Sequence, residues 1–177
     1  LKQLSPIPIK STFLGAHAVP EEFKNNKAAY MYLVCNEMLP RIAGENLADF
    51  IDIFCETGYF DLDDLKQIIE AGGKYGIKAK VHVNQFNSFG AVQLACTHGA
   101  LSVDHLEVMK EEDYIALEQS NTLATALPLC SLFLDIPYTP GKDPIKRNTP
   151  LVIASDVHPG SAQSSNYKLE LGLARPQ

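Results

Sequence analysis

The polarity pattern alternates between short apolar runs and amphipathic stretches almost from one end of the chain to the other. Runs rich in β-branched and aromatic residues predict strands at Ser11–His17, Phe50–Cys55, Ile77–Val83, Ala100–Val103, Thr122–Leu127 and Leu151–Ala154. Apolar residues at helical spacing predict helices at Lys27–Ile42, Leu62–Tyr75, Phe89–Thr97 and Glu111–Gln119. The strand runs are short, apolar and without alternation, which favours a parallel sheet that is buried on both faces and connected through helices.

Two segments depart from this alternation of strands and helices. Between Pro128 and Pro144 the chain carries four prolines and a glycine, which leaves little room for a regular helix before the last strand. After Gly160 the residues are small and polar, and Tyr167–Gln177 predicts at most one short helix.

The alternation of strands and helices predicts the α/β class and, within it, a barrel of parallel strands. A (β/α)8 TIM barrel needs eight strands, and six are predicted here. We therefore expect residues 1–177 to form a single partial domain, an incomplete (β/α)8 barrel.

Composition narrows the function classes. The 177 residues, 46% hydrophobic and 20% charged, are typical of a globular protein. A net charge of −6 without a cluster of Lys or Arg argues against a nucleic-acid partner. We expect no membrane association, because apolar runs stay well short of the roughly 20 residues that span a bilayer. The N-terminus lacks a secretion signal, and the four cysteines in apolar settings predict buried, reduced thiols in a cytoplasmic protein.

Three of the predicted strands end at residues that could bind a metal or catalyse a reaction. His82 closes one strand, His105 follows the next, and Asp156 follows the last apolar run. The carboxyl ends of parallel strands gather on one face of a barrel, so these side chains are expected to converge. Two imidazoles and a carboxylate are suitable for holding a divalent metal and activating water, and Asp156 could also serve as general base.

Other polar residues lie at the same carboxyl ends of the predicted strands. His17 closes the first strand, and Gln85 follows His82 closely enough to hydrogen-bond an amide or imide. Gly160 and Ser161 offer backbone N–H groups and a hydroxyl to a substrate carboxylate. Glu56 is as readily explained by an ion pair with a nearby lysine as by a direct role, and His98 is expected at the surface.

Five runs, in order, resemble imidazolonepropionase, an amidohydrolase-superfamily enzyme of histidine degradation. They are Ser11–Pro20, Asp52–Gly58, the run around His82, Asp104–Glu107 and Ser155–Ser161. The resemblance implies strands three to eight of a (β/α)8 barrel with one Zn²⁺ or Fe³⁺ ion. It also implies hydrolysis of 4-imidazolone-5-propanoate, a small-molecule substrate, to N-formimidoyl-L-glutamate. The resemblance is also compatible with a homodimer.

The resemblance also implies a role for each matching residue. His82 and Asp156 match metal ligands, and Asp156 also shuttles the proton. His105 matches the histidine that orients or polarises the substrate. The substrate-contacting positions are His17, Gln85, His158, Gly160 and Ser161.

Departures from the family pattern leave other interpretations open. The His-x-His pair of the first strand, which supplies two further ligands, is absent from this chain, and His158 stands where the family usually has Asn. With His82 and Asp156 alone, metal affinity would be weak, and this chain by itself is not expected to turn over substrate. The alternatives are another cyclic amidase or deaminase of the superfamily and a non-catalytic α/β remnant.

Overall fold

A computed structural model describes residues 4–175 of the chain. Six parallel strands form one sheet in chain order, so that each strand pairs with its neighbours in sequence. The strands are β1 (Thr12–Ala16), β2 (Phe50–Cys55), β3 (Lys78–Val83), β4 (Ser102–His105), β5 (Leu123–Ala126) and β6 (Leu151–Ile153). All the predicted strands are therefore present, with small shifts at their ends.

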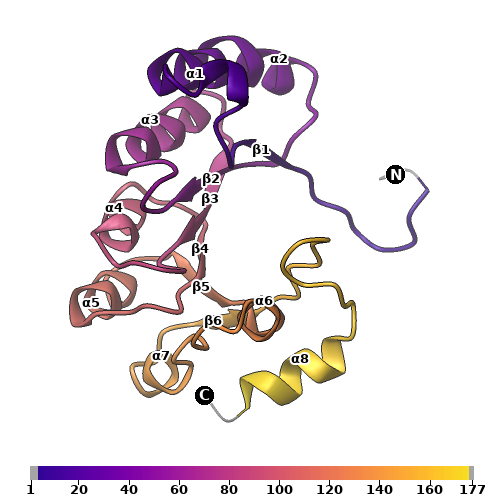
Figure 1. Ribbon diagram of the computed structural model, residues 1–177, viewed down its shortest axis with the longest axis vertical. Helices are drawn as coiled ribbons and strands as arrows, with labels where there is room; N and C mark the ends of the chain where they lie inside the picture. Colours follow the sequence, from indigo (N-terminus) through magenta and orange to yellow (C-terminus); the bar gives the residue numbers. More distant parts are fainter. Residues whose placement is uncertain (1–3, 176–177) are drawn as a thin grey trace.

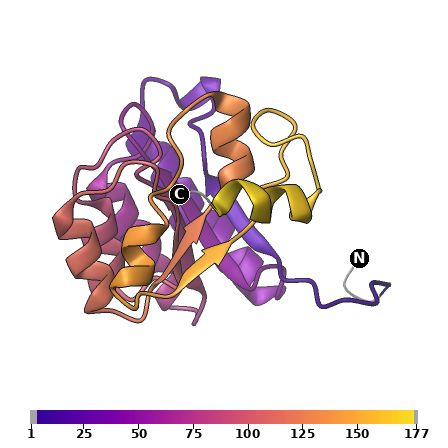
Figure 2. The same cartoon turned by 90° about the horizontal axis from the view of Figure 1, so that it is seen from below.

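Helical segments connect the strands and follow the last of them. They are η1 (Glu21–Phe23), α1 (Lys27–Leu33), η2 (Val34–Met38), α2 (Leu39–Gly44), α3 (Leu62–Gly73), α4 (Ala91–Thr97), α5 (Glu111–Glu118), α6 (Pro128–Leu134), α7 (Lys142–Lys146) and α8 (Tyr167–Ala174). In Figure 1 the strands form an arc, with α1 to α5 on its outer side and α8 on the other side. Figure 2 shows β5 and β6 side by side and the segment before β1 extending away from the sheet.

The predicted helix over Lys27–Ile42 is continuous but contains a π-helical segment, η2, between α1 and α2. Pro40 explains this irregularity, because it has no N–H for the carbonyl of the preceding turn and its ring crowds that carbonyl. The backbone N–H of Leu39 reaches back to the carbonyl of Val34, a wider turn that accommodates the proline. The helix therefore passes through Pro40 instead of ending there.

The expectation of no regular helix between β5 and β6 is wrong, because α6 and α7 both lie there. Pro128 occupies the first turn of α6, where a helical N–H has no intrahelical partner in any case. Pro144 lies in the first turn of α7 for the same reason. The single short helix predicted near the C-terminus is present as α8.

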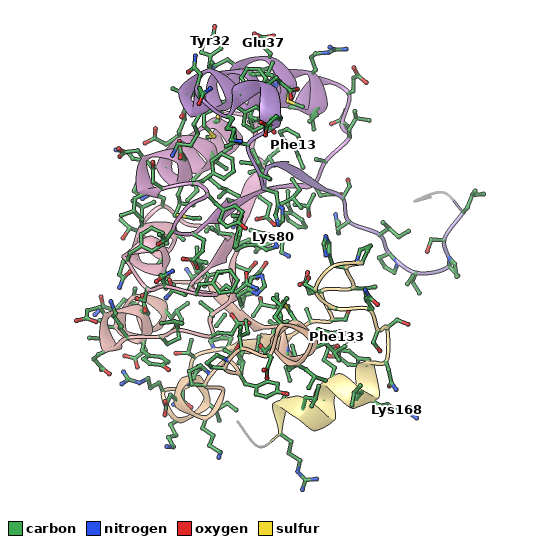
Figure 3. All side chains as sticks on the ribbon, in the orientation of Figure 1. Phe13, Tyr32, Glu37, Lys80, Phe133 and Lys168 are labelled. Atoms are coloured by element: carbon green, nitrogen blue, oxygen red, sulfur yellow. The ribbon has the colours of Figure 1, made fainter. Side chains whose placement is uncertain are left out.

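The prediction of strands without alternation is also wrong for β3. Ala79, Val81 and Val83 are buried on one face, whereas Lys80 and His82 point to the other. The first face packs against helices in the hydrophobic core. Lys80 lies on the side of the strands away from α3 and α4 (Figure 3). The concave face therefore carries polar side chains, and this is the face that the site uses.

Close packing of α3 on the sheet depends on one glycine. A Cβ atom at Gly72 would lie 2.6 Å from the carbonyl oxygen of Ile77 and 2.9 Å from the side chain of Ile51. A larger residue would push the end of α3 away from β2 and from the start of β3.

The sheet is open, because β1 and β6 are its two edges. A closed barrel would have no such edges. The architecture is therefore that of a partial barrel, as the sequence predicts. In the described part of the chain, none of the helices has the length and apolar character needed to cross a bilayer.

Candidate functional site

The carboxyl ends of the strands surround a cavity of about 580 Å³. Every residue that the sequence proposes for the site lines this cavity: His17, His82, Gln85, His105, Asp156, His158, Gly160 and Ser161. They come from loops and strands spread over most of the chain. The parallel topology brings them together, although their individual roles stay predictions.

His82 is held in place by a carboxylate of the neighbouring strand. Its Nδ1 atom lies 2.8 Å from Oδ1 of Asp52, and the two side chains are 16% and 5% exposed. Burial alone lowers the pKa of His82, but the hydrogen bond to Asp52 and its negative charge raise the pKa above the ordinary 6.5. Burial raises the pKa of Asp52, and the hydrogen bond from His82 opposes this shift.

Three imidazoles lie against one another in the cavity. The ring centroids of His17 and His82 are 5.6 Å apart, and those of His82 and His105 are 5.3 Å apart. His17 also stacks on Phe54, with centroids 5.4 Å apart. Burial, together with the neighbouring His82 and His158, lowers the pKa of His17. A neutral His17 can offer both a donor and an acceptor to a substrate.

An unusual backbone conformation directs His105 towards His82. In the parallel register, His105 pairs with Val83, whose side chain belongs to the hydrophobic core. A φ of 86° at His105 breaks the strand geometry at this point, and its imidazole lines the cavity. Such a conformation is costly for a residue with a Cβ atom, and strain of this kind is frequent at functional sites. The hydroxyl of Thr139 donates to the carbonyl of His105 and holds the distorted segment.

Asp156 and the loop after it form the opposite wall. Asp156 has a φ of 47°, a conformation that aspartate tolerates better than most residues. In the following turn, the N–H of Gly160 donates to Nδ1 of His158 at 3.0 Å, and the Ser161 hydroxyl lies 3.3 Å from the same atom. The donors proposed for a substrate carboxylate are therefore engaged with His158 in this structure, because the backbone N–H of Ser161 also donates to the His158 carbonyl at 3.4 Å.

The loop after β3 is fixed by Glu56, which is 1% exposed. Its carboxylate accepts hydrogen bonds from the backbone N–H groups of Phe86 and Asn87 and from the side-chain amide of Asn87. Neither alternative considered for Glu56, an ion pair with lysine or a place in the cavity wall, describes this arrangement. In the same loop Gln85 reaches the cavity, where its amide donates to the Cys130 sulfur at 3.5 Å.

The donor types at this site are suitable for Zn²⁺ or Fe³⁺, but their number is small. His82 presents an imidazole whose other nitrogen is bound to a buried carboxylate, an arrangement typical of metal-ligating histidines. Asp156 offers a second donor on the same cavity. Within residues 4–175, however, three or more His, Cys, Asp or Glu side chains do not converge as a metal site. The described residues therefore supply at most part of a coordination shell.

Several residues of the site were not found from the sequence. The apolar part of the wall consists of Leu14, Phe54, Tyr59, Phe86 and Leu134. Asp52, behind His82, was also missed. Its signal is a carboxylate in the middle of the apolar strand Phe50–Cys55, because a buried charge in such a strand requires a partner. His98, expected at the surface, is half-buried at the end of α4 and lies outside the cavity wall.

Comparison with known structures supports the fold. The Arabidopsis protein ADAL complexed with GMP aligns with 96% of this chain and 48% of its own at a TM-score of 0.70 and 15% identity. An adenosine deaminase from Xanthomonas campestris with bound zinc aligns with 92% of this chain and 41% of its own, at a TM-score of 0.67 and 12% identity. An amidohydrolase from a Sargasso Sea sample gives a TM-score of 0.62 over 90% of this chain and 39% of its own, at 13% identity.

Sequence comparison is more specific. No family model matches the chain. Curated proteins named imidazolonepropionase match at 52% identity over 98% of the chain in Christiangramia forsetii and over 96% in Flavobacterium psychrophilum. A third, from Thermoanaerobacter pseudethanolicus, is 38% identical over 98%. The chain spans about 42% of the length of these relatives. The resemblance indicated by its motifs is thus confirmed along nearly all its length, and the chain is an imidazolonepropionase-like segment with the fold of a partial amidohydrolase barrel.

Proposed function

We propose that the protein containing this chain hydrolyses a ring carbon–nitrogen bond of 4-imidazolone-5-propanoate to give N-formimidoyl-L-glutamate. The observation that carries the proposal is the single cavity shared by all the residues that match the imidazolonepropionase pattern. The sequence identity to enzymes of that name supports the choice of substrate.

The geometry suggests a distinct part for each wall of the cavity. His17 and Gln85 would contact the imidazolone ring from the side of β1 and β3. His105, on the neighbouring strand, would orient and polarise the ring carbonyl. Gly160 and Ser161 would bind the propanoate once His158 releases their donors.

In the reaction, water adds to the ring carbonyl, the carbon–nitrogen bond breaks, and the nitrogen takes up a proton. Asp156 would take a proton from the attacking water and deliver it to the departing nitrogen. His82 and Asp156 would also contribute to holding a Zn²⁺ or Fe³⁺ ion, and such an ion supplies a water of lowered pKa and polarises carbonyls. The four free, buried cysteines support a cytoplasmic location for the protein.

The test is the formation of N-formimidoyl-L-glutamate by the longest natural form of the protein that contains residues 1–177. We expect His82→Ala and Asp156→Asn each to lower kcat/KM by about 100-fold or more, because each removes a group placed at the reacting atoms. His98→Ala is the matched control, since His98 lies at the end of α4 and outside the cavity wall.

Metal analysis is the second readout. Bound zinc or iron that is lost on either His82→Ala or Asp156→Asn supports the proposal. Full activity in both variants would contradict it. Release of ammonia from a different cyclic substrate, without ring opening of the imidazolone, would favour a deaminase instead.

A further inference from the structure

We propose that Asp52 is a positioning residue that keeps the proton of His82 on Nδ1 and so turns the free electron pair of Nε2 towards the cavity. The inference deepens the proposed function and rests on it, because His82 has a chemical role only if the cavity is a reaction site. It assigns a role to a residue that lies behind the cavity wall and does not line the cavity itself.

The register of the sheet explains how Asp52 reaches His82. In the register of β2 and β3, Asp52 lies opposite Lys80, and Phe54 lies opposite His82. The side chains of Asp52 and His82 therefore both project from the concave face, offset by two residues on adjacent strands. Nδ1 of His82 lies 2.8 Å from Oδ1 of Asp52. An ionised carboxylate can only accept hydrogen bonds, so the shared proton of a neutral ring belongs on Nδ1.

The aspartate itself is held in one orientation. The same Oδ1 atom accepts the backbone N–H of Ile53 at 2.7 Å, and the side chain is 5% exposed. A carboxylate fixed in this way has no freedom to follow a moving imidazole. It therefore sets the ring orientation as well as the position of the proton.

Two neighbouring carboxylates show that this contact is specific. Asp104 lies on β4 and belongs to the same concave face, but it pairs with Lys80, whose Nζ atom is 3.3 Å from its Oδ2. Glu107 approaches Nδ1 of His105 only to 3.5 Å, and among the described residues that nitrogen has no hydrogen-bond partner. Asp52 and His82 are therefore the pair with a hydrogen bond short enough to fix a tautomer.

The experiment is ¹⁵N NMR of the histidine side chains in the 177-residue chain, at a pH at which the imidazoles are neutral. We expect wild-type His82 to show the signature of a proton on Nδ1 and none on Nε2. In Asp52→Asn, the amide can donate to Nδ1, and the proton should shift to Nε2. Asp104→Asn is the matched control, because it removes the buried carboxylate that lies opposite His82 on β4 but is paired with Lys80 and not with the ring, and it should leave the tautomer unchanged.

A proton on Nε2 in the wild-type protein would overturn the proposal, and this spectrum is informative even if a variant fails to fold. The proposal is also wrong if a folded Asp52→Asn keeps the wild-type tautomer, or if Asp104→Asn changes it as much as Asp52→Asn does. The readout does not depend on turnover. If the 177-residue chain shows the wild-type tautomer but the longest natural form of the protein does not hydrolyse imidazolone, the result counts against the proposed function and not against the positioning of His82.

Discussion

At the scale of single residues, two buried carboxylates that do not line the cavity hold the site residues in place. Asp52 lies behind His82, and Glu56 holds the loop that carries Gln85. Both are almost completely buried, which is costly for a charge unless hydrogen bonds replace the lost water. Their hydrogen bonds are therefore essential to the local structure.

Replacing Glu56 by Gln should loosen the loop after β3. One acceptor oxygen becomes an N–H₂ group. The backbone N–H groups of Phe86 and Asn87 share Oε2, whereas the Thr57 N–H and the Asn87 side-chain amide share Oε1, so one of these two pairs of donors loses its acceptor. We expect a loss of about 1–3 kcal/mol in the free energy of unfolding and faster amide exchange at Phe86 and Asn87 or at Thr57. Denaturant unfolding and hydrogen exchange measure both effects.

Glu37→Gln is the control for that change. Glu37 lies on η2 and is exposed, at the top of the molecule in Figure 3. Its replacement should alter neither quantity measurably. Unchanged stability together with unchanged exchange at Thr57, Phe86 and Asn87 in Glu56→Gln would show that the carboxylate does not hold the loop.

The polar residues of the cavity were predictable from sequence, whereas its apolar wall and the supporting residues behind it were not. His82, His105 and Asp156 stand where apolar runs end, and the rule that parallel strands share one carboxyl edge brings them together. Glu56 was misjudged because its partners are backbone N–H groups of a distant loop, which a sequence does not display. Asp52 lies inside an apolar strand, and its partner His82 lies on a different strand, 30 residues further along the chain, so the sequence does not display the contact.

At the scale of elements, helix boundaries follow local chemistry closely. The helix α3 begins at Leu62, as predicted, and the structure shows a capping box between Asp61 and Asp64 just before and within its first turn. The two helices between β5 and β6 were not predicted, because their prolines were treated as breakers without regard to position. In the first turn of a helix, proline removes no hydrogen bond.

The stability of α3 should depend on pH through Asp61. The hydrogen bond from Lys27 lowers the pKa of Asp61 in the folded protein. A carboxylate whose pKa is lower in the folded than in the unfolded chain stabilises the fold above its ordinary pKa, near 3.9. That contribution is lost as the pH falls through the folded value.

Asp61→Asn isolates the charge, because asparagine caps helices about as well as aspartate. We expect it to be less stable than wild type by about 0.2–1 kcal/mol at pH 7, since the ion pair is partly exposed. The difference should shrink as the pH drops below 4, as urea titrations at each pH would reveal. Asp63→Asn, an exposed carboxylate of the same turn, should show a smaller difference. Equal effects of the two variants would contradict the role of Lys27.

At the scale of the whole molecule, the main feature is the open sheet. β1 and β6 each present one unpaired edge, and Val152 on β6 is 40% exposed. Unpaired edges are templates for pairing with another chain, and a lysine on the edge strand opposes such pairing. We therefore expect the 177-residue chain to self-associate with rising concentration and Val152→Lys to do so less.

Sedimentation velocity over a range of concentrations measures this association. Ile115→Lys provides a matched control, because Ile115 is also 40% exposed but lies on α5, away from both edges. It should behave like the wild type. A wild-type chain that stays monomeric at all concentrations, or equal effects of the two lysines, would rule out pairing through β6. A homodimer of the natural protein stays a prediction.

The left-handed backbone positions at the strand ends set a limit on how far this fold can be made more robust. Asn84, His105, Leu106 and Asp156 all adopt positive φ values next to the cavity. Glycine would remove the backbone strain at each position. At Leu106, which is buried in the core, and at Asn84, which donates to Asp113, it would also remove packing or a buried hydrogen bond. The other two, His105 and Asp156, are the side chains to which the proposed function assigns chemistry. The strained positions are therefore poor targets for raising the stability of this fold, and a more stable variant requires substitutions away from the cavity.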